Sequence, residues 1–245
     1  MQGKLVLQDG DDEPTAVMLE KIRGEKERLT KENKIKKVDL LPIIDSDEIP
    51  YNLPDNWEWV RLGEVINYNC AKKVSSSEIP EDAWLLGLED IEKDTSRIIQ
   101  RVTFKDKRSK STKAKFEEGD VLYGKLRPYL NKVIVADKDG FCTTEIIPLK
   151  CYYGLFPKYL MYTLKRPDFL EYVNSKTYGI NLPRLGTEDA RSALIPLPPF
   201  EEQIRIVAKV DQLMSLCDEL EAGLVQAQTD GGKLMEAVVH YVLAG

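Results

Sequence analysis

Residues 196–221 read PLPPFEEQIRIVAKVDQLMSLCDELE, and this stretch decides how the rest of the chain divides. Its prolines cannot continue a preceding helix, whereas Glu201 and Glu202 suit the positive end of a helix that begins here. Apolar residues then recur at alternating spacings of four and three, at positions Ile206, Val210, Leu213, Cys217, Leu220 and Leu224. This spacing is typical of the seam between two helices of a coiled coil.

The predicted seam helix has about 30 residues and a length of roughly 45 Å, which exceeds the diameter of a small domain. We therefore expect it to pack on another long helix, as a spacer or dimer contact. The alternative is that the apolar stripe packs only on the chain's own domain, as in many surface helices. Residues 229–232, TDGG, predict a break before a last helical stretch.

A further helix is predicted near the start of the chain, after a polar lead. Asp11 or Asp12 can cap it. Met18, Ile22 and Leu29 lie on one face, and the other face is charged. We therefore group these three residues with the seam as a second surface for helix packing.

Between these helices, residues 50–198 predict a central domain of the α+β class. Short β-type runs predict strands at 57–62, 98–104, 120–123, 132–136 and 145–149, and the aromatic stretch 157–175 predicts a helix. The chain then divides into an N-terminal helix and proline-containing linker (1–49), the central domain (50–198) and a C-terminal region (199–245) with the seam helix and a terminal helix.

Charge is distributed unevenly along the chain. The formal net charge is −6, yet residues 97–138 carry twelve Lys or Arg against five Asp or Glu. Residues 199–230 carry two basic residues against seven acidic ones. A phosphate backbone responds to charge within about 10 Å at ordinary salt, so the local excess matters more than the total.

Residues 105–115, KDKRSKSTKAK, form the densest cluster of positive charge and are called the basic segment below. Its cations are Lys105, Lys107, Arg108, Lys110, Lys113 and Lys115. Together with three hydroxyl side chains, they predict contacts to nucleic-acid phosphates. The alternative is a solvated loop without a partner.

Two further segments, 119–132 (GDVLYGKLRPYLNK) and 178–186 (YGINLPRLG), offer side chains that can read bases. Arg127 can bind guanine through two hydrogen bonds, and Asn131 can bind adenine in the same way. Gly124 would let the backbone approach a phosphate. The predicted contact residues of the two segments are Lys125, Arg127, Tyr129, Asn131, Lys132, Asn181 and Arg184. A hairpin with an ordinary polar end is the alternative for the first segment.

The residue types argue against catalysis and metal binding in this chain. The four cysteines show no CxxC spacing and His240 is the single histidine, so neither a zinc site nor histidine acid–base catalysis is expected. An amino-methyltransferase would need Asn or Asp before its paired prolines, but Leu197 occupies that position. For a nuclease, residues 89–93 supply carboxylates and a lysine without a persuasive arrangement. We predict no catalytic residue, no metal and no cofactor.

Targeting signals are not evident either. No apolar run approaches the roughly 18 residues that span a bilayer. The acidic start, MQGKLVLQDGDDEPT, lacks the order of a signal peptide. We therefore expect a cytoplasmic protein without a membrane partner.

Several of these segments resemble the specificity subunits of type I restriction–modification systems. The resemblance rests on residues 2–29, 53–65, 119–136, 179–185 and 196–221, and so covers nearly the whole chain. It implies a DNA target-recognition domain that reads half of a bipartite site, with helices that set spacing and dock methyltransferase subunits. It also implies that S-adenosylmethionine, and ATP with Mg²⁺ in a restriction complex, bind to partner subunits, which include a restriction subunit.

The chain departs from this family pattern because it has room for one recognition domain where the family resembles two in tandem. Its end followed by its own start would rebuild a junction typical of the family. We therefore expect a half-subunit that forms a homodimer, or that pairs with another half. The alternative from another class is a non-catalytic helical scaffold whose central domain binds another protein.

Overall fold

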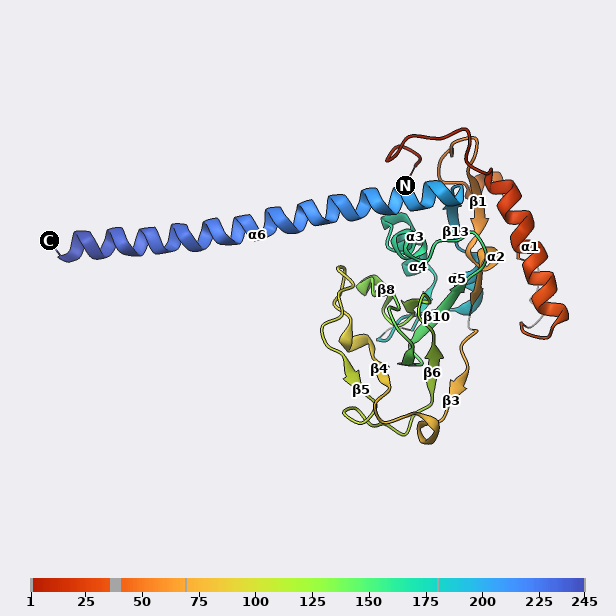
Figure 1. Ribbon diagram of the computed structural model, residues 1–245, viewed down its shortest axis with the longest axis horizontal. Helices are drawn as coiled ribbons and strands as arrows, with labels where there is room; N and C mark the ends of the chain where they lie inside the picture. Colours follow the sequence, from red (N-terminus) through yellow and green to blue (C-terminus); the bar gives the residue numbers. More distant parts are fainter. Residues whose placement is uncertain (1, 36–40, 69, 180, 245) are drawn as a thin grey trace.

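The long C-terminal helix extends away from a mixed domain that lies below its first turns (Figure 1). A shorter N-terminal helix runs along the edge of the domain that faces away from the free end of the long helix. The computed structural model describes residues 2–35, 41–68, 70–179 and 181–244. Its α-helices are α1 (Thr15–Lys31), α2 (Leu62–Val65), α3 (Pro157–Leu164), α4 (Pro167–Ser175), α5 (Thr187–Ser192) and α6 (Phe200–Ala244). Short 3₁₀ turns are η1 (Ser46–Glu48), η2 (Ser76–Glu78), η3 (Leu88–Asp90) and η4 (Pro128–Leu130).

The strands form two main sheets and two short pairs. One sheet has the order β2 (Ile66–Tyr68), β10 (Ile146–Cys151), β7 (Val121–Gly124), β8 (Val133–Val135). The other has the order β3 (Lys73–Val74), β6 (Lys113–Phe116), β9 (Gly140–Thr143), β4 (Trp84–Leu86), β5 (Val102–Thr103). The pairs are β1 (Glu58–Arg61) with β13 (Leu194–Leu197), and β11 (Thr177–Tyr178) with β12 (Arg184–Leu185). All neighbours are antiparallel except β4 and β9.

The predicted α+β class is confirmed, with differences in detail. Four of the five predicted strands appear as β1, β7, β8 and β10, because their β-branched and apolar residues fill the core. The fifth shrinks to β5, and the predicted helix 157–175 divides into α3 and α4 at Arg166 and Pro167, since proline disfavours a helical conformation in the preceding residue. Strand β6 takes up the end of the basic segment, which the sequence presented as a loop.

Helix α1 packs on its own chain and not on a second helix, which corrects one prediction. Met18 and Ile22 are each 1% exposed in the main core, and Leu29 is half-buried against it. Gly154 makes this possible, because a Cβ there would lie 2.4 Å from the Met18 sulfur. Asp12 does not cap α1; its carboxylate accepts hydrogen bonds from Arg205 at 3.0 and 2.5 Å.

The first turns of α6 are embedded in the central domain. The Gln203 side chain is fully buried and donates to the carbonyls of Gly154 (2.9 Å) and Pro198 (3.1 Å). Glu202 accepts hydrogen bonds from Trp57 Nε1 and Gln8 Nε2, both at 2.8 Å. These contacts join the polar lead of the chain to the start of the long helix.

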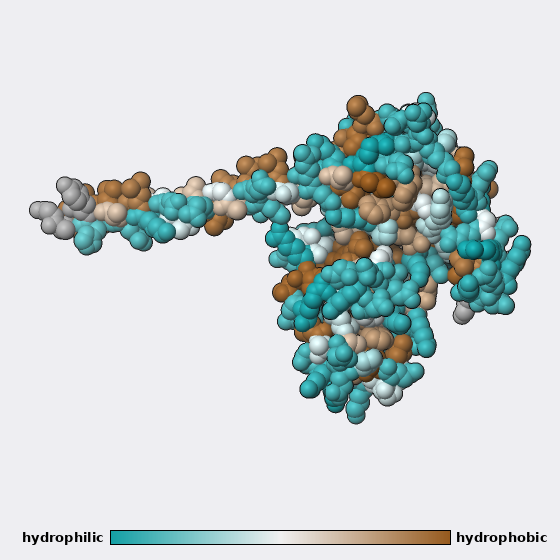
Figure 2. All heavy atoms as spheres, in the orientation of Figure 1, coloured by the Kyte–Doolittle hydropathy of each residue, from teal (hydrophilic) through white to brown (hydrophobic). Residues whose placement is uncertain are grey.

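The predicted seam divides in two along α6. Ile206 is 2% exposed in the core and Val210 is half-buried, so these two positions serve the chain's own domain. The remaining seam positions, Leu213, Cys217, Leu220 and Leu224, are exposed. The predicted break at residues 229–232 is wrong, because α6 continues as one helix to Ala244. Figure 2 shows hydrophobic side chains recurring along the part of α6 that leaves the domain.

Candidate nucleic-acid interface

The loop between β7 and β8, residues 125–132, is called the Arg127 loop below. Arg127 and Asn131 adopt left-handed backbone conformations, each with φ 51°, on either side of the turn η4. Such values are uncommon outside glycine, so the surrounding contacts must define this loop closely. Arg127 and Tyr129 are exposed, and Asn131 is half-buried. The loop therefore presents a guanidinium and a phenol on a rigid turn.

The second predicted segment meets the first in space. The Arg127 N–H donates to the Pro183 carbonyl at 2.7 Å, and the Leu185 N–H donates to the Lys125 carbonyl at 3.1 Å. An isolated β-bridge joins Leu126 and Arg184. The Arg127 loop and the hairpin of β11 and β12 thus form one surface, called the Arg127 surface below. The contacting residues are more than 50 positions apart in the sequence, and Asn181 is also exposed there.

Arg184 is less available than the sequence indicated. Its guanidinium donates two hydrogen bonds, each 3.1 Å long, to the carboxylate of Glu145. These bonds raise the pKa of Arg184 and hold its charge in place. The sequence did not predict a role for Glu145, which only began a predicted strand, or for the Pro183 carbonyl. No motif marks either residue, because their role depends on where β10 and the hairpin meet.

Two lysines are held by the turn η3. The Lys132 ammonium donates to the Leu88 carbonyl at 2.7 Å, and Lys107 forms ion pairs with Glu89 and Asp90. Burial opposes the charge of Lys107, but the hydrogen bond to Glu89 and the two carboxylates outweigh it, so its pKa is raised. Both cations therefore organise the surface as well as charging it.

The expected approach of a phosphate to Gly124 is not supported. A Cβ at this position would lie 2.8 Å from the Leu88 side chain and 3.2 Å from the Lys132 carbonyl. Gly124 is buried in β7. The missing side chain thus makes room for the chain's own packing and not for a ligand.

The basic segment separates into exposed and engaged cations. Lys113 is only 2% exposed, which corrects its assignment as a surface contact. Its ammonium donates to the hydroxyls of Ser109 and Ser111, each at 2.6 Å, and burial lowers its pKa. Arg108 pairs with Glu81. The exposed cations without an ion pair to any described residue are Lys105, Lys110 and Lys115.

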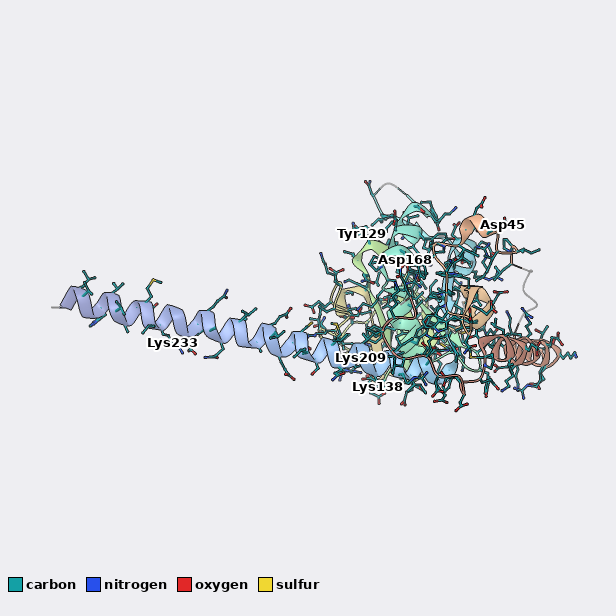
Figure 3. All side chains as sticks on the ribbon, turned by 90° about the horizontal axis from the view of Figure 1, so that it is seen from above. Asp45, Tyr129, Lys138, Asp168, Lys209 and Lys233 are labelled. Carbon is teal, nitrogen blue, oxygen red and sulfur yellow. The ribbon has the colours of Figure 1, made fainter. Side chains whose placement is uncertain are left out.

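The basic surface is not confined to one loop. Lys138, which the sequence analysis counted but did not single out, is exposed, and its ammonium lies 5.4 Å from the centre of the Trp84 ring. Figure 3 places Tyr129 and Lys138 on opposite sides of the central domain in the view from above. Nucleic acid that follows both would have to run across the domain.

The carboxylates weighed for a nuclease have other partners. Asp90 is fully buried and accepts hydrogen bonds from the Gly87 N–H at 2.7 Å and from Gln100 at 2.9 Å. Glu92 accepts a bond from the Thr95 hydroxyl. Over the described ranges, no group of three or more His, Cys, Asp or Glu side chains is placed to hold a metal ion. Nor does any helix in this part of the chain combine the length and apolar character needed to cross a membrane.

Comparison with known proteins identifies the family of this chain. Residues 54–227 match the family described as the type I restriction modification DNA specificity domain. The chain belongs to this family. The match includes the central domain and the first half of α6, and therefore both segments that form the Arg127 surface.

Curated members of the specificity family are longer than this chain. The chain is 34% identical to the type I restriction enzyme EcoAI specificity subunit of Escherichia coli, over 90% of its own length and 38% of the relative's. It is 29% identical to the EcoEI specificity subunit of the same organism, over 99% of its length and 43% of the relative's. The chain thus spans about two-fifths of these relatives.

Solved structures give the same result for the fold of this specificity domain. The HsdS subunit from Thermoanaerobacter tengcongensis matches with a TM-score of 0.64 and 28% identity, over 76% of this chain and 49% of that one. A chain from a structural study of complex assembly and conformational transition in the type I R-M system matches with a TM-score of 0.67 and 27% identity. That match covers 79% of this chain and 51% of the other.

Proposed function

We propose that this chain reads one half of a bipartite DNA site as part of the specificity component of a type I restriction–modification enzyme. The observation that carries the proposal is the joining of the Arg127 loop to the hairpin of β11 and β12. Arg127, Tyr129 and Asn181 are exposed on these joined segments and can donate hydrogen bonds to base edges. The exposed lysines of the basic segment supply contacts to phosphates.

Selection of bound duplexes from a random pool tests this function. The chain is used with and without a type I methyltransferase subunit, and the bound DNA is sequenced. We expect enrichment of a short defined sequence in at least one condition. If neither condition enriches any sequence, the proposal is refuted, and salt-insensitive binding of a protein partner would favour the scaffold alternative.

The exposed part of α6 supports pairing with a second long helix. From Leu213 to the end of the helix, apolar side chains such as Leu220 (61% exposed) and Leu224 (66% exposed) face solvent. This part is about 48 Å long. Gly223, Gly231 and Gly232 weaken an isolated helix by roughly 1 kcal/mol each relative to alanine, so tertiary packing must supply the stability. We assign the partner helix to a second copy, related by a two-fold axis.

In this proposal, methylation and cleavage of DNA are catalysed by other subunits. Methyltransferase subunits would dock on the helical region and bind S-adenosylmethionine, and a restriction subunit would bind ATP and Mg²⁺. The chain itself supplies no catalytic residue and acts where these subunits meet chromosomal DNA, in the cytoplasm. Purification of the assembled complex, followed by methylation assays that omit one subunit at a time, tests this division.

A further inference from the structure

Residues 92–97, here called the Arg97 turn, lie between η3 and β5 and are held in a tight conformation. Asp94 and Ser96 both have left-handed backbones, with φ 61° and 62°. The Glu92 N–H donates to the Arg97 carbonyl at 2.8 Å, and the Ser96 N–H donates to the Glu92 carbonyl at 3.2 Å. Non-glycine residues keep such angles only where neighbouring contacts over-determine them.

One side of the Arg97 turn contacts the Arg127 loop. The Asp94 N–H donates to the Leu130 carbonyl at 3.2 Å, and the Ser96 hydroxyl donates to the Asn131 carbonyl at 3.2 Å. The Ser96 oxygen also accepts a hydrogen bond from the Val133 N–H at 3.3 Å. One backbone–backbone hydrogen bond and the Ser96 hydroxyl therefore join the Arg97 turn to the Arg127 loop and to the start of β8.

The other side of the Arg97 turn contacts the long helix. The Arg97 guanidinium donates to Asp218 of α6 at 2.7 Å. The preceding polar contact between the central domain and α6 is at Asp211, whose carboxylate accepts hydrogen bonds from Lys158 at 2.7 Å and from Tyr162 at 2.5 Å. Asp218 lies seven residues further, about 10 Å along the axis. Figure 1 shows this yellow loop rising toward α6, and Figure 2 shows hydrophilic atoms joining domain and helix beyond a gap.

We propose that the Arg97 turn positions α6 relative to the Arg127 surface, so that Arg97 and Asp218 set the separation at which two half-sites are read. This inference rests on the proposed function for its DNA consequence. From Asp211 to the end of α6 the helix extends about 50 Å, so a tilt of 10° at its base moves the tip by about 9 Å. That displacement exceeds two base-pair steps of about 3.4 Å. The contact at Asp218, beyond Asp211, limits this tilt.

The exposure of the pair makes the role separable from folding. Arg97 and Asp218 side chains are 64% and 52% exposed, and exposed pairs contribute little to stability. We therefore expect substitution to leave the domain folded and to change the direction of α6. A matched control exists in Arg101 and Asp137, an exposed Arg–Asp pair of the same domain that does not involve α6.

Distances between spin labels test the positioning role without DNA. Labels are attached at Glu118→Cys in the central domain and Gln228→Cys on α6, in a full-length chain whose exposed Cys70 and Cys217 are replaced by serine. Labelled protein is diluted into excess unlabelled chain, so that distances within one chain are measured. We expect one narrow distribution.

Three variants give distinct outcomes in this measurement. Arg97→Ala should broaden the distance distribution about twofold, as should high salt, because the pair is screened. The reversed pair, Arg97→Asp with Asp218→Arg, should restore the narrow distribution, and Arg101→Ala should leave it unchanged. An unchanged distribution for Arg97→Ala, or equal broadening by Arg101→Ala, would overturn the proposal.

A binding experiment with the methyltransferase subunit tests the consequence for DNA. Duplexes carry the selected half-sites with spacers that differ by one or two base pairs. Arg97→Ala should bind a single half-site like the unsubstituted chain but reduce an approximately tenfold preference among spacers to less than about threefold. Weaker half-site binding with unchanged spacer preference would overturn the positioning role. If no protein selects DNA, the proposed function fails, and the label distances alone decide the positioning role.

Discussion

Removal of the three unpaired lysines of the basic segment gives a quantitative test of phosphate binding. Lys105, Lys110 and Lys115 are exposed, and the described residues supply no ion-pair partner for them. The other three cations of the segment are engaged within the chain. We therefore expect the triple alanine variant to fold normally, because no internal contact is lost, and to bind DNA with a weaker dependence on salt.

The magnitude follows from counterion release. Each phosphate contact contributes about 0.9 to the slope of log K against log salt, so three contacts contribute about 2.7. Between 50 and 200 mM salt, a slope difference of 2.7 corresponds to roughly a 40-fold difference in the loss of affinity. Fluorescence anisotropy of a labelled random duplex, titrated at several salt concentrations, measures both slopes directly.

A second triple variant shows whether position or total charge is responsible. Lys4, Lys31 and Lys34 are exposed lysines of the N-terminal region, and their replacement by alanine removes the same charge. This control should leave the slope nearly unchanged. If both triples flatten the slope equally, or if neither does, the basic segment is not the phosphate-binding element and the reasoning is refuted.

Four further outcomes are expected. Arg127→Ala should weaken binding to the selected sequence more than to random duplexes, by a factor on the order of ten or more, since a bidentate base contact is lost; equal losses would contradict base reading. Leu213→Asp with Leu220→Asp should give monomers in sedimentation, because carboxylates are costly in a helix seam; an unchanged mass would exclude that seam. Met18→Ala should lower the free energy of unfolding in urea by about 2–5 kcal/mol, because the side chain is 1% exposed. Burial raises the pKa of Glu202, so ionisation of its carboxyl opposes folding. As the pH rises from the ordinary to the raised pKa, the unsubstituted chain should lose free energy of unfolding and the Glu202→Gln variant should not, as urea titrations across the acidic range would measure.

The sequence located both halves of the candidate site but not their contact. The Arg127 loop and the hairpin at residue 184 stand out by composition, since arginine and asparagine follow strand-like runs. Their meeting depends on the pairing of β7 with β10 and on the bond from the Arg127 N–H to Pro183. Pairings between distant segments leave no periodic signal in one sequence, so this part of the site required the structure.

Helical periodicity predicted correctly which faces of the helices are apolar, but it predicted in part the wrong packing partners for them. Met18, Ile22 and Ile206 do lie on apolar stripes, but a stripe reports burial without saying against what. The expected break at Gly231 failed for a related reason. A glycine lowers helix stability by about 1 kcal/mol, which does not end a helix that packing against a partner can stabilise.

The burial of Lys113 could not be predicted from composition. Lys113 belongs to a run of cations, yet as the first residue of β6 it turns inward and closes the loop over Ser109 and Ser111. A count of charges treats it like Lys110, which is exposed. The side of the strand does not make this distinction, because Lys113 and Lys115 share one face of β6 and only Lys113 is buried. It arises from the preceding loop, whose Ser109 and Ser111 hydroxyls accept hydrogen bonds from Lys113.

The negative charge of α6 has two consequences that act together. Its acidic side chains repel phosphates within about 8–10 Å, so under the proposed function they would keep bound DNA off the helix and on the Arg127 surface. The same charge recruits the domain's own cations, since Asp211 binds Lys158 and Asp218 binds Arg97. A neutral helix would lose both effects, because it would neither repel a phosphate backbone nor form ion pairs with Lys158 and Arg97. The net charge of −6 conceals this contrast between an acidic helix and the basic residues 97–138. In the two proposals above, the helix sets the spacing and the central domain reads the bases.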